Sequence, residues 1–264
     1  MVCSSEWEAL NALDIAMVRR DLGSAGDTVV IEERLEGWET SAHAFCDGKT
    51  AAMMPFATDY KRAQDSDIGL NTGGMGAYSP SAEVDDALAA RIREDVVERA
   101  LAGMAEEGRP FNGTLFPGLM VTDDGIRVLE FNARFGDPEA QVLLPRLEGD
   151  LFAIARAAAD GELAGVDVQW SEQAAVGVVL ASGGYPATYK MSYIIDGLDD
   201  VDDDVLVFHA GTTQSARGIV TNGGRVLTVV GMGTTVAEAR KKAYDNVKRI
   251  HFQDVQYRTD IAKP

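Results

Sequence analysis

The chain has 264 residues, of which 46% are hydrophobic and 25% are charged. This length and composition suit one large or two modest globular domains. Acidic residues outnumber basic residues by 42 to 24, which gives a formal net charge of -18. Because nucleic acid and anionic membranes attract basic protein surfaces, we expect neither as a partner.

The chain is poor in residues suited to disulfide, zinc or histidine-dependent chemistry. Cys3 and Cys46 show no spacing typical of a metal site or a disulfide framework, so we expect a reducing, cytoplasmic location. The three histidines, His43, His209 and His251, show no recognisable pairing, and we expect each to be structural or on the surface. Neither a signal peptide nor an apolar stretch long enough to cross a bilayer is visible.

The opening residues predict a helix followed by strands. A capping box from Ser5 to Glu8 predicts a helix that ends near Gly23. Residues 28–35 are rich in β-branched side chains and predict a strand. Two further strands are expected around the hairpin dipeptide Asp47-Gly48, at residues 39–46 and 49–56.

The middle of the chain predicts a long loop, a helix and a hairpin. Residues 59–80 combine charge and glycine with little periodicity, and we expect a loop of the kind that is often functional. Apolar residues at helical spacing predict a helix over residues 84–104. A hairpin over residues 114–122 and 126–133 follows, and a helix over residues 149–159 completes the first predicted domain.

After Trp170 the sequence changes to short strands separated by glycine-rich turns. The strands are expected at residues 175–181, 205–210, 218–222 and 225–231. Asn222-Gly223 predicts a hairpin, and a capping box at Thr235 predicts a final helix. We therefore expect an α+β fold with two domains, residues 1–170 and residues 171–264.

The most informative chemistry lies in residues 128–141. Successive side chains of a strand point to opposite faces, so Glu130 and Asn132 are expected to share one face. A carboxylate and an amide oxygen so placed suit a hard cation such as Mg²⁺. Arg134 follows on the same side, with a guanidinium suited to carboxylate or phosphate. The alternative for such a pattern alone is an ordinary half-solvated strand end.

Other segments are weak signals individually and stronger together. The Gly-rich loop at residues 71–76 lacks the P-loop pattern and alone would suit a flexible connector. The pair Lys61-Arg62 and the carboxylates of residues 32, 33 and 39 would alone suit a solvated surface. In combination with the Glu130 segment they suit the binding of ATP with a divalent metal. The segment 196–204 is rich in Asp but lacks the pattern of a calcium-binding loop, so we expect a solvated acidic loop.

Five segments read together closely resemble one enzyme family. They are residues 30–39, 59–62, 71–80, 130–139 and 175–186. The third reads Asn-Thr-Gly-Gly-Met-Gly-Ala-Tyr-Ser-Pro and the fourth reads Glu-Phe-Asn-Ala-Arg-Phe-Gly-Asp-Pro-Glu, a highly specific combination. Over essentially its whole length the chain resembles phosphoribosylamine-glycine ligase, also called glycinamide ribonucleotide synthetase.

The resemblance implies a fold and an activity. Residues 1–170 would be the later part of an ATP-grasp domain, and residues 171–264 would be the family's C-terminal domain. The family uses ATP, with Mg²⁺ or Mn²⁺, to join glycine to 5-phosphoribosylamine through glycyl phosphate in purine synthesis. The alternatives are an inactive folded binding module and another ATP-grasp carboxylate-amine ligase.

The resemblance also implies residue roles. The metal ligands would be Glu130 and Asn132. The nucleotide would be met at the adenine by Glu32, Glu33, Arg34 and Leu35, and near the ribose by Glu39. Residues at the phosphates and substrate would be Asp59, Lys61, Asn71, Thr72, Gly73 and Gly74. Arg134 and Asp137 would face the reacting acyl group.

The sequence departs from the family pattern at several points. Ala133 stands where the family commonly has Cys, and Arg34 stands where it usually has an aromatic residue. Many ATP-grasp proteins carry an acidic metal ligand on the partner strand, but residues 117–120 contain none. The family's N-terminal half has no counterpart, so the resemblance implies a truncated chain that is inactive alone. We expect exposed apolar surface along the opening helix and the 28–35 strand.

Overall fold

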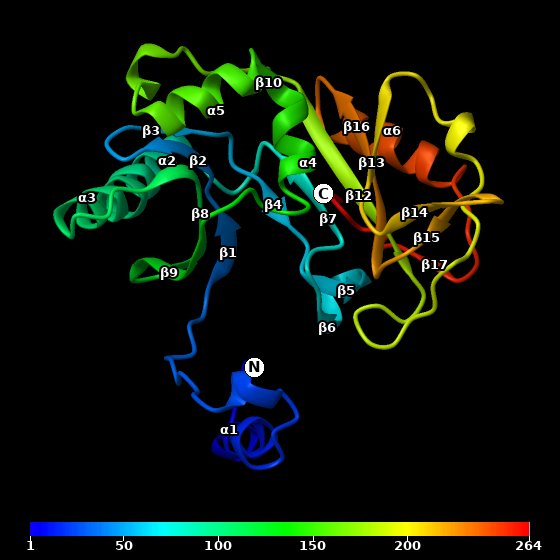
Figure 1. Cartoon of the computed structure of the whole chain (residues 1–264), viewed down its shortest axis with the longest axis horizontal. Helices are drawn as coiled ribbons and strands as arrows, with labels where there is room; N and C mark the ends of the chain where they lie inside the picture. The colour runs from blue at the N-terminus through cyan, green and yellow to red at the C-terminus, as the bar shows by residue number, and fades with distance from the viewer. Residues whose placement is uncertain (264) are drawn as a thin grey trace.

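The computed structural model describes residues 1–263 and has an α+β fold built on two main antiparallel sheets (Figure 1). The first sheet has five strands: β1 (Trp38–Ser41), β8 (Asn112–Thr122), β2 (Ala44–Asp47), β3 (Ala51–Met53) and β9 (Gly125–Asn132). The second has six strands: β13 (Val205–His209), β16 (Arg225–Gly233), β12 (Ala174–Ser182), β7 (Gly76–Ser79), β4 (Thr58–Asp59) and β17 (Val255–Gln256). The candidate site lies where the two sheets approach each other.

Three two-stranded ribbons complete the strands. They are β5 (Arg62–Gln64) with β6 (Ile68–Asn71), β10 (Leu147–Glu148) with β11 (Gln169–Trp170), and β14 (Thr212–Ser215) with β15 (Gly218–Thr221). The β5–β6 hairpin connects β4 to β7. The connection between these two strands of the second sheet is therefore a hairpin that is not part of that sheet.

Helices cover the sheets and bury their apolar stripes. The continuous helix of α2 (Asp86–Ile92), a π-helical turn (Arg93–Glu98) and α3 (Arg99–Glu106) packs Val97 and Leu101 against Leu115 of the first sheet. The short helix α4 (Ala140–Leu143) and the helix α5 (Leu151–Asp160) share a second cluster. Helix α6 (Val236–Val247) packs on the second sheet. The predicted helices over 84–104, over 149–159 and after Thr235 are confirmed.

The predicted strand over residues 28–35 is wrong. These residues form no strand and pair with none among residues 1–263. Val30 and Ile31 are 79% and 78% exposed. A β-branched segment becomes a strand only when another strand satisfies its backbone hydrogen-bonding groups, and none does so here.

The opening helix is shorter than predicted. Ser5 caps α1 (Glu6–Leu13) through a hydrogen bond from the Glu8 amide to Ser5 Oγ, and a π-helical turn ends at Val18. Figure 1 shows this N-terminal segment set apart from the two sheets. Trp7 is 73% exposed and Val18 is 74% exposed, which confirms the expected apolar surface.

The predicted long loop over residues 59–80 is also wrong. It contains β4, the β5–β6 hairpin and β7. Strand β7 forms because it pairs with β12, with Ala77 opposite Gly177, roughly a hundred positions along the chain. Short strands held by such distant partners leave no local periodicity to detect.

The two predicted hairpins of the first part are confirmed, whereas the Asn222-Gly223 hairpin is wrong. Strand β2 pairs with β3 across Asp47-Gly48, and β8 pairs with β9. Strand β15 pairs instead with β14, and β16 lies between β12 and β13. The single strand expected over residues 39–46 is divided into β1 and β2, which both pair with β8.

The second sheet runs across the expected domain boundary at residue 170. Strands β4 and β7 precede it, and their neighbour β12 follows it. The division into residues 1–170 and 171–264 therefore stays a prediction about domain organisation. No helix in the part of the chain that the structure describes is both long and apolar enough to cross a membrane.

Candidate functional site

Strand β9 brings Glu130 and Asn132 into contact. Its pairing with β8 places Glu130 opposite Gly118 and Asn132 opposite Phe116. Asn132 Nδ2 donates a hydrogen bond to Glu130 Oε1 at 3.1 Å, and Arg134 Nη2 donates to Asn132 Oδ1 at 3.4 Å. The side chains of these three residues thus form one contiguous polar group, as strand alternation predicts.

The donor set of this group fits a hard cation with few protein ligands. A half-turn of the Asn132 amide would bring its oxygen beside the Glu130 carboxylate. The facing residues of β8 add no side-chain oxygen, because they run from Phe116 to Leu119. Residues 1–263 contain no cluster of three or more His, Cys, Asp or Glu that could hold a metal. A cation here would need water or phosphate oxygens to complete its shell, as Mg²⁺ commonly does.

Lys61 and Glu39 form an ion pair at the start of the β5–β6 hairpin. Lys61 Nζ lies 3.2 Å from Glu39 Oε2. Burial acts to lower the pKa of Lys61, but the charges of nearby carboxylates, Glu39 first, outweigh it and raise that pKa. Lys61 therefore stays cationic. Glu39, which the resemblance places near a ribose, contacts Lys61 in this structure.

Two carboxyl groups, that of the half-buried Asp59 and that of the buried Glu139, lie near this ion pair. Glu139 is 2% exposed and accepts a long hydrogen bond from Ser41 Oγ, at 3.4 Å. Asp59 Oδ1 is buried without a hydrogen-bond partner in the described residues. Burial raises the pKa of both groups, and the Glu139 charge raises that of Asp59 further. We call these two residues the carboxyl pair.

His43 lies near Glu139 of the carboxyl pair. Its ring is fully buried and stacks on Phe116 with the centroids 4.2 Å apart. Neither ring nitrogen has a hydrogen-bond partner among residues 1–263. Burial, with a smaller contribution from the Arg134 charge, lowers the pKa of His43 to about 3. The ring is neutral, so it adds no charge to balance the carboxyl pair.

Two glycines leave the space that this packing needs. A Cβ at Gly136 would lie 2.6 Å from both His43 Nε2 and Glu139 Oε2. A Cβ at Gly74, where φ is +110°, would lie 2.3 Å from Pro138 and 2.6 Å from Asp59 Oδ1. At Gly74 the positive φ and the Pro138 ring leave room only for glycine, whereas at Gly136 a side chain would have to displace His43 or Glu139.

The C-terminal part of the chain contributes Arg225 and Tyr185. Arg225 Nη1 donates to the carbonyls of Gly73 at 2.7 Å and Asp137 at 2.8 Å, and its Nη2 donates to Asp137 Oδ2 at 2.8 Å. The Gly73 amide donates to Tyr185 Oη at 3.0 Å. These contacts bring the predicted residues Gly73 and Asp137 together.

The predicted adenine-contacting residues are not joined to this group. Glu32, Glu33 and Arg34 are exposed and Leu35 is half-buried in the unpaired segment before β1. The ion pair of Arg34 is with Glu36, at 3.8 Å. Asn71 ends the exposed strand β6, and Thr72 Oγ1 donates to the Lys61 carbonyl at 2.9 Å. The roles assigned to these residues stay predictions.

Four contributors, Glu139, His43, Arg225 and Tyr185, were given no site role by the sequence. Glu139 and Tyr185 fall within segments that carry the family resemblance, which is the one signal that pointed toward them. His43 and Arg225 lie outside those segments. Their positions depend on contacts between distant parts of the chain, so their local sequence gave no signal.

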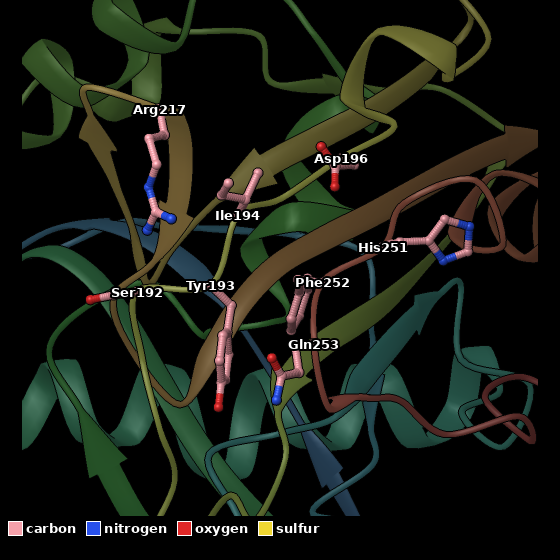
Figure 2. Close-up of a pocket in the computed structure, with 8 residues that line it drawn as sticks. All are labelled: Ser192, Tyr193, Ile194, Asp196, Arg217, His251, Phe252 and Gln253. Atoms are coloured by element: carbon pink, nitrogen blue, oxygen red, sulfur yellow. The ribbon is translucent and has the colours of Figure 1, made fainter.

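A separate shallow cavity of about 550 Å³ lies in the C-terminal part (Figure 2). It is lined by Ser192, Tyr193, Ile194, Asp196, Arg217, His251, Phe252 and Gln253. No predicted site residue lines it. Figure 2 shows Arg217 and His251 on different elements and apart from each other, so the cavity lacks the convergent polar groups of the site above.

Two family models match the chain. Residues 1–140 match "Phosphoribosylglycinamide synthetase, ATP-grasp (A) domain", and residues 175–264 match "Phosphoribosylglycinamide synthetase, C domain". The first match covers more than half of the chain. It includes Glu130, Asn132 and the carboxyl pair.

Curated relatives agree with both matches. The chain is 46% identical to phosphoribosylamine–glycine ligase of Brucella melitensis, over 99% of this chain and 61% of that protein. It is 47% identical to the ligase of Halalkalibacterium halodurans, over 99% of this chain and 60% of that protein. The trifunctional purine biosynthetic protein adenosine-3 of Gallus gallus is 47% identical, over 99% of this chain and 26% of that protein. The chain thus spans about three fifths of the bacterial relatives.

The solved structure of phosphoribosylamine–glycine ligase from Thermotoga maritima is similar in fold and sequence. It superposes with a TM-score of 0.77 and 37% identity, covering 87% of this chain and 57% of that chain. Phosphoribosylglycinamide synthetase from Anaerococcus prevotii, at 16% identity and a TM-score of 0.63, shares the fold. The sequence motifs, the fold and both domain matches agree, and the chain belongs to the phosphoribosylglycinamide synthetase family.

Proposed function

We propose that this chain provides metal- and acyl-binding residues for the ATP-dependent joining of glycine to 5-phosphoribosylamine. The observation that carries the proposal is the contiguous group of Glu130, Asn132 and Arg134, which the chain combines with the carboxyl pair. The names of the relatives at 46–47% identity supply the reaction. The chain spans about three fifths of those relatives, so the activity belongs to the whole enzyme.

The proposed reaction has two steps. A glycine carboxylate oxygen attacks the γ-phosphorus of ATP, and the bond from that phosphorus to the bridging oxygen breaks, giving glycyl phosphate and ADP. The amine of phosphoribosylamine then attacks the acyl carbon, a C–N bond forms, phosphate leaves and the amine loses a proton. Negative charge develops on phosphoryl and acyl oxygens in both steps, and Arg134 is placed to stabilise it.

Glu130 and Asn132 would hold Mg²⁺ or Mn²⁺. When bound, such an ion supplies positive charge beside the phosphate oxygens of ATP. Both side chains carry oxygen acceptors of the type that these cations prefer. The facing residues of β8 carry no side-chain oxygen, so the remaining coordination positions of the cation are left for phosphate oxygens.

The carboxyl pair suits the ammonium group of glycine. Among the described residues, no Lys or Arg lies within ion-pair distance of Asp59 or Glu139, whereas Lys61 is paired with Glu39 and Asp137 with Arg225. The charge of Lys61 acts on both carboxyl groups from beyond ion-pair distance, so they favour a ligand that brings positive charge and N–H donors into contact with them. Holding the ammonium group there would leave the glycine carboxylate free to react.

A titration with Mg-ATP tests the metal assignment. In Glu130→Gln we expect affinity to fall by about tenfold or more, because the loss of one charged interaction costs about 1.5–3 kcal/mol. Glu172→Gln removes another exposed carboxylate, outside the site, and is the matched control. An unchanged titration in Glu130→Gln would remove Glu130 from the metal site.

A chimera tests the reaction itself. It would join this chain to the portion of the Brucella melitensis ligase that lies outside the matched region. We expect ADP release that depends on both glycine and 5-phosphoribosylamine, and loss of it in Glu139→Gln. A folded chimera that binds Mg-ATP but shows no glycine-dependent ADP release would contradict the proposed function.

A further inference from the structure

Arg258 is the largest fully buried side chain of the described residues, at 1% exposure, although it lies close to the C-terminus. Its Nε and Nη2 donate to the two Asp260 carboxylate oxygens, each at 2.7 Å. Its Nη1 donates to Asp67 Oδ1 at 2.7 Å and to the Arg62 carbonyl at 3.2 Å. Burial acts to lower the pKa of Arg258, but the bonds to Asp260 and Asp67 outweigh it and raise that pKa. The guanidinium is therefore a permanent cation that links the C-terminal tail to the β5–β6 hairpin.

The turn of the hairpin is held by the same tail. The Thr259 amide donates to Asp65 Oδ1 at 2.7 Å, and Thr259 Oγ1 donates to Asp65 Oδ2. The Ser66 amide donates to Asp260 Oδ2 at 2.7 Å. Ser66 and Asp67 adopt left-handed φ values of 61° and 52°, which non-glycine residues seldom do. Contacts from the tail thus fix a turn that would be unfavourable alone.

A second contact runs from the tail to the candidate site through Tyr60. The Arg258 guanidinium lies 4.8 Å from the centroid of the Tyr60 ring, and Tyr60 Oη accepts a hydrogen bond from the Ala262 amide at 3.0 Å. Side chains alternate along an extended segment, so Tyr60 points away from its neighbours Asp59 and Lys61. The tail therefore contacts the rear of the segment that presents these two residues.

The far end of the hairpin returns to the same segment. The Thr72 amide donates to the Lys61 carbonyl at 2.7 Å, and the Met75 amide donates to the Tyr60 carbonyl at 2.8 Å. The hairpin begins next to Lys61 and ends at Asn71. A change in the orientation of the hairpin therefore moves the predicted site residues at both of its ends, Lys61 and Thr72.

We propose that the C-terminal tail, residues 257–262, braces the hairpin, and that Arg258 is a positioning residue for Asp59 and Lys61. The inference rests on the proposed function in one respect, which is that Asp59 and Lys61 are site residues. The brace itself is independent of ATP, metal and glycine.

The test uses Asp67→Asn in the whole chain. Asp67 is mostly exposed, and this isosteric change removes the Arg258–Asp67 ion pair, while the Arg258–Asp260 pair and the hydrogen bonds of Asp65 and Asp260 remain. Two readouts are measured without ligand: amide hydrogen exchange of residues 62–72, and the rate at which Lys61 is acetylated relative to the exposed Lys190. We expect exchange of the hairpin amides to rise about tenfold, with the amides of β12 and β16 unchanged.

Lys61 acetylation separates positioning from stability. We expect it to rise severalfold in Asp67→Asn and further in Arg258→Lys, which keeps the charge but loses the forked geometry. Arg249→Met removes an exposed bidentate ion pair with Asp202 and is the matched control, with no change in either readout. Unchanged Lys61 acetylation in both variants, or an equal rise in Arg249→Met, would overturn the proposal. Because neither readout requires nucleotide or glycine, failure of the proposed function would appear separately, in the Mg-ATP titration and the chimera.

Discussion

Two groups of buried charge lie on opposite sides of the Asp59–Lys61 segment, and they differ in how completely they are paired. The tail brace matches one guanidinium with two carboxylates, a carbonyl and an aromatic ring. The carboxyl pair has a long hydrogen bond from Ser41, an Asp59 oxygen without a hydrogen-bond partner among residues 1–263, and a neutral His43 near Glu139. The first group is complete without a ligand, whereas the second leaves acceptors for one. In the proposed function, the paired charges support the site and the unpaired carboxyl groups receive the ligand.

The largest expected effect breaks the complete group. Arg258→Met removes the guanidinium that donates to Asp260, Asp67 and the Arg62 carbonyl, and although Asp260 keeps the Ser66 amide, we expect the free energy of unfolding to fall by about 3–5 kcal/mol. Urea denaturation followed by circular dichroism measures it. A loss below 1 kcal/mol would mean that the two groups do not differ in their contribution to stability.

The next largest effect is the loss of stability that protonation of His43 causes as the pH falls. Its pKa of about 3 in the fold lies below the ordinary value of 6.5, so the unfolded chain binds more protons between these values. Stability contributed by the neutral ring is therefore present above pH 6.5 and is lost as pH falls toward 3. Between pH 7 and pH 5 this loss is about 2 kcal/mol. In His43→Leu we expect that part of the acid sensitivity to disappear, and an unchanged pH profile would contradict it.

The smallest effect has the opposite sign. The raised pKa of Glu139 means that its contribution to stability is present below the unfolded pKa and is lost as pH rises through the folded value. Glu139→Gln should therefore stabilise the fold at pH 7 by roughly 1 kcal/mol, with no gain near pH 4. Thermal unfolding at the two pH values measures this. Destabilisation at pH 7 would show that Glu139 is a structural group like Asp260.

The grouping of Glu130, Asn132 and Arg134 could be predicted from local sequence. The other contributors to the site could not, because contacts between distant parts of the chain position them. Strand alternation and the turn at residues 123–125 placed Glu130 beside Asn132 correctly. Glu139 meets Ser41 across 98 positions, and Arg225 meets Asp137 across 88. At residues 28–35 the local sequence predicted a strand that does not form. Their β-branched composition suits a strand, but they pair with no strand among residues 1–263.

The pairing of β7 with β12 has a consequence for how the family's parts can be exchanged. The two matched regions end at residue 140 and begin at residue 175, which suggests modules that could be swapped as cassettes. Yet Val176 and Val178 of β12 face Tyr78 and Gly76 of β7, from the other module. A graft of residues 175–264 would leave that edge of β12 without its neighbour, and a graft that also carried residues 58–79 would bring it along. The unit that can be transplanted is therefore a sheet assembled from two separate stretches of chain.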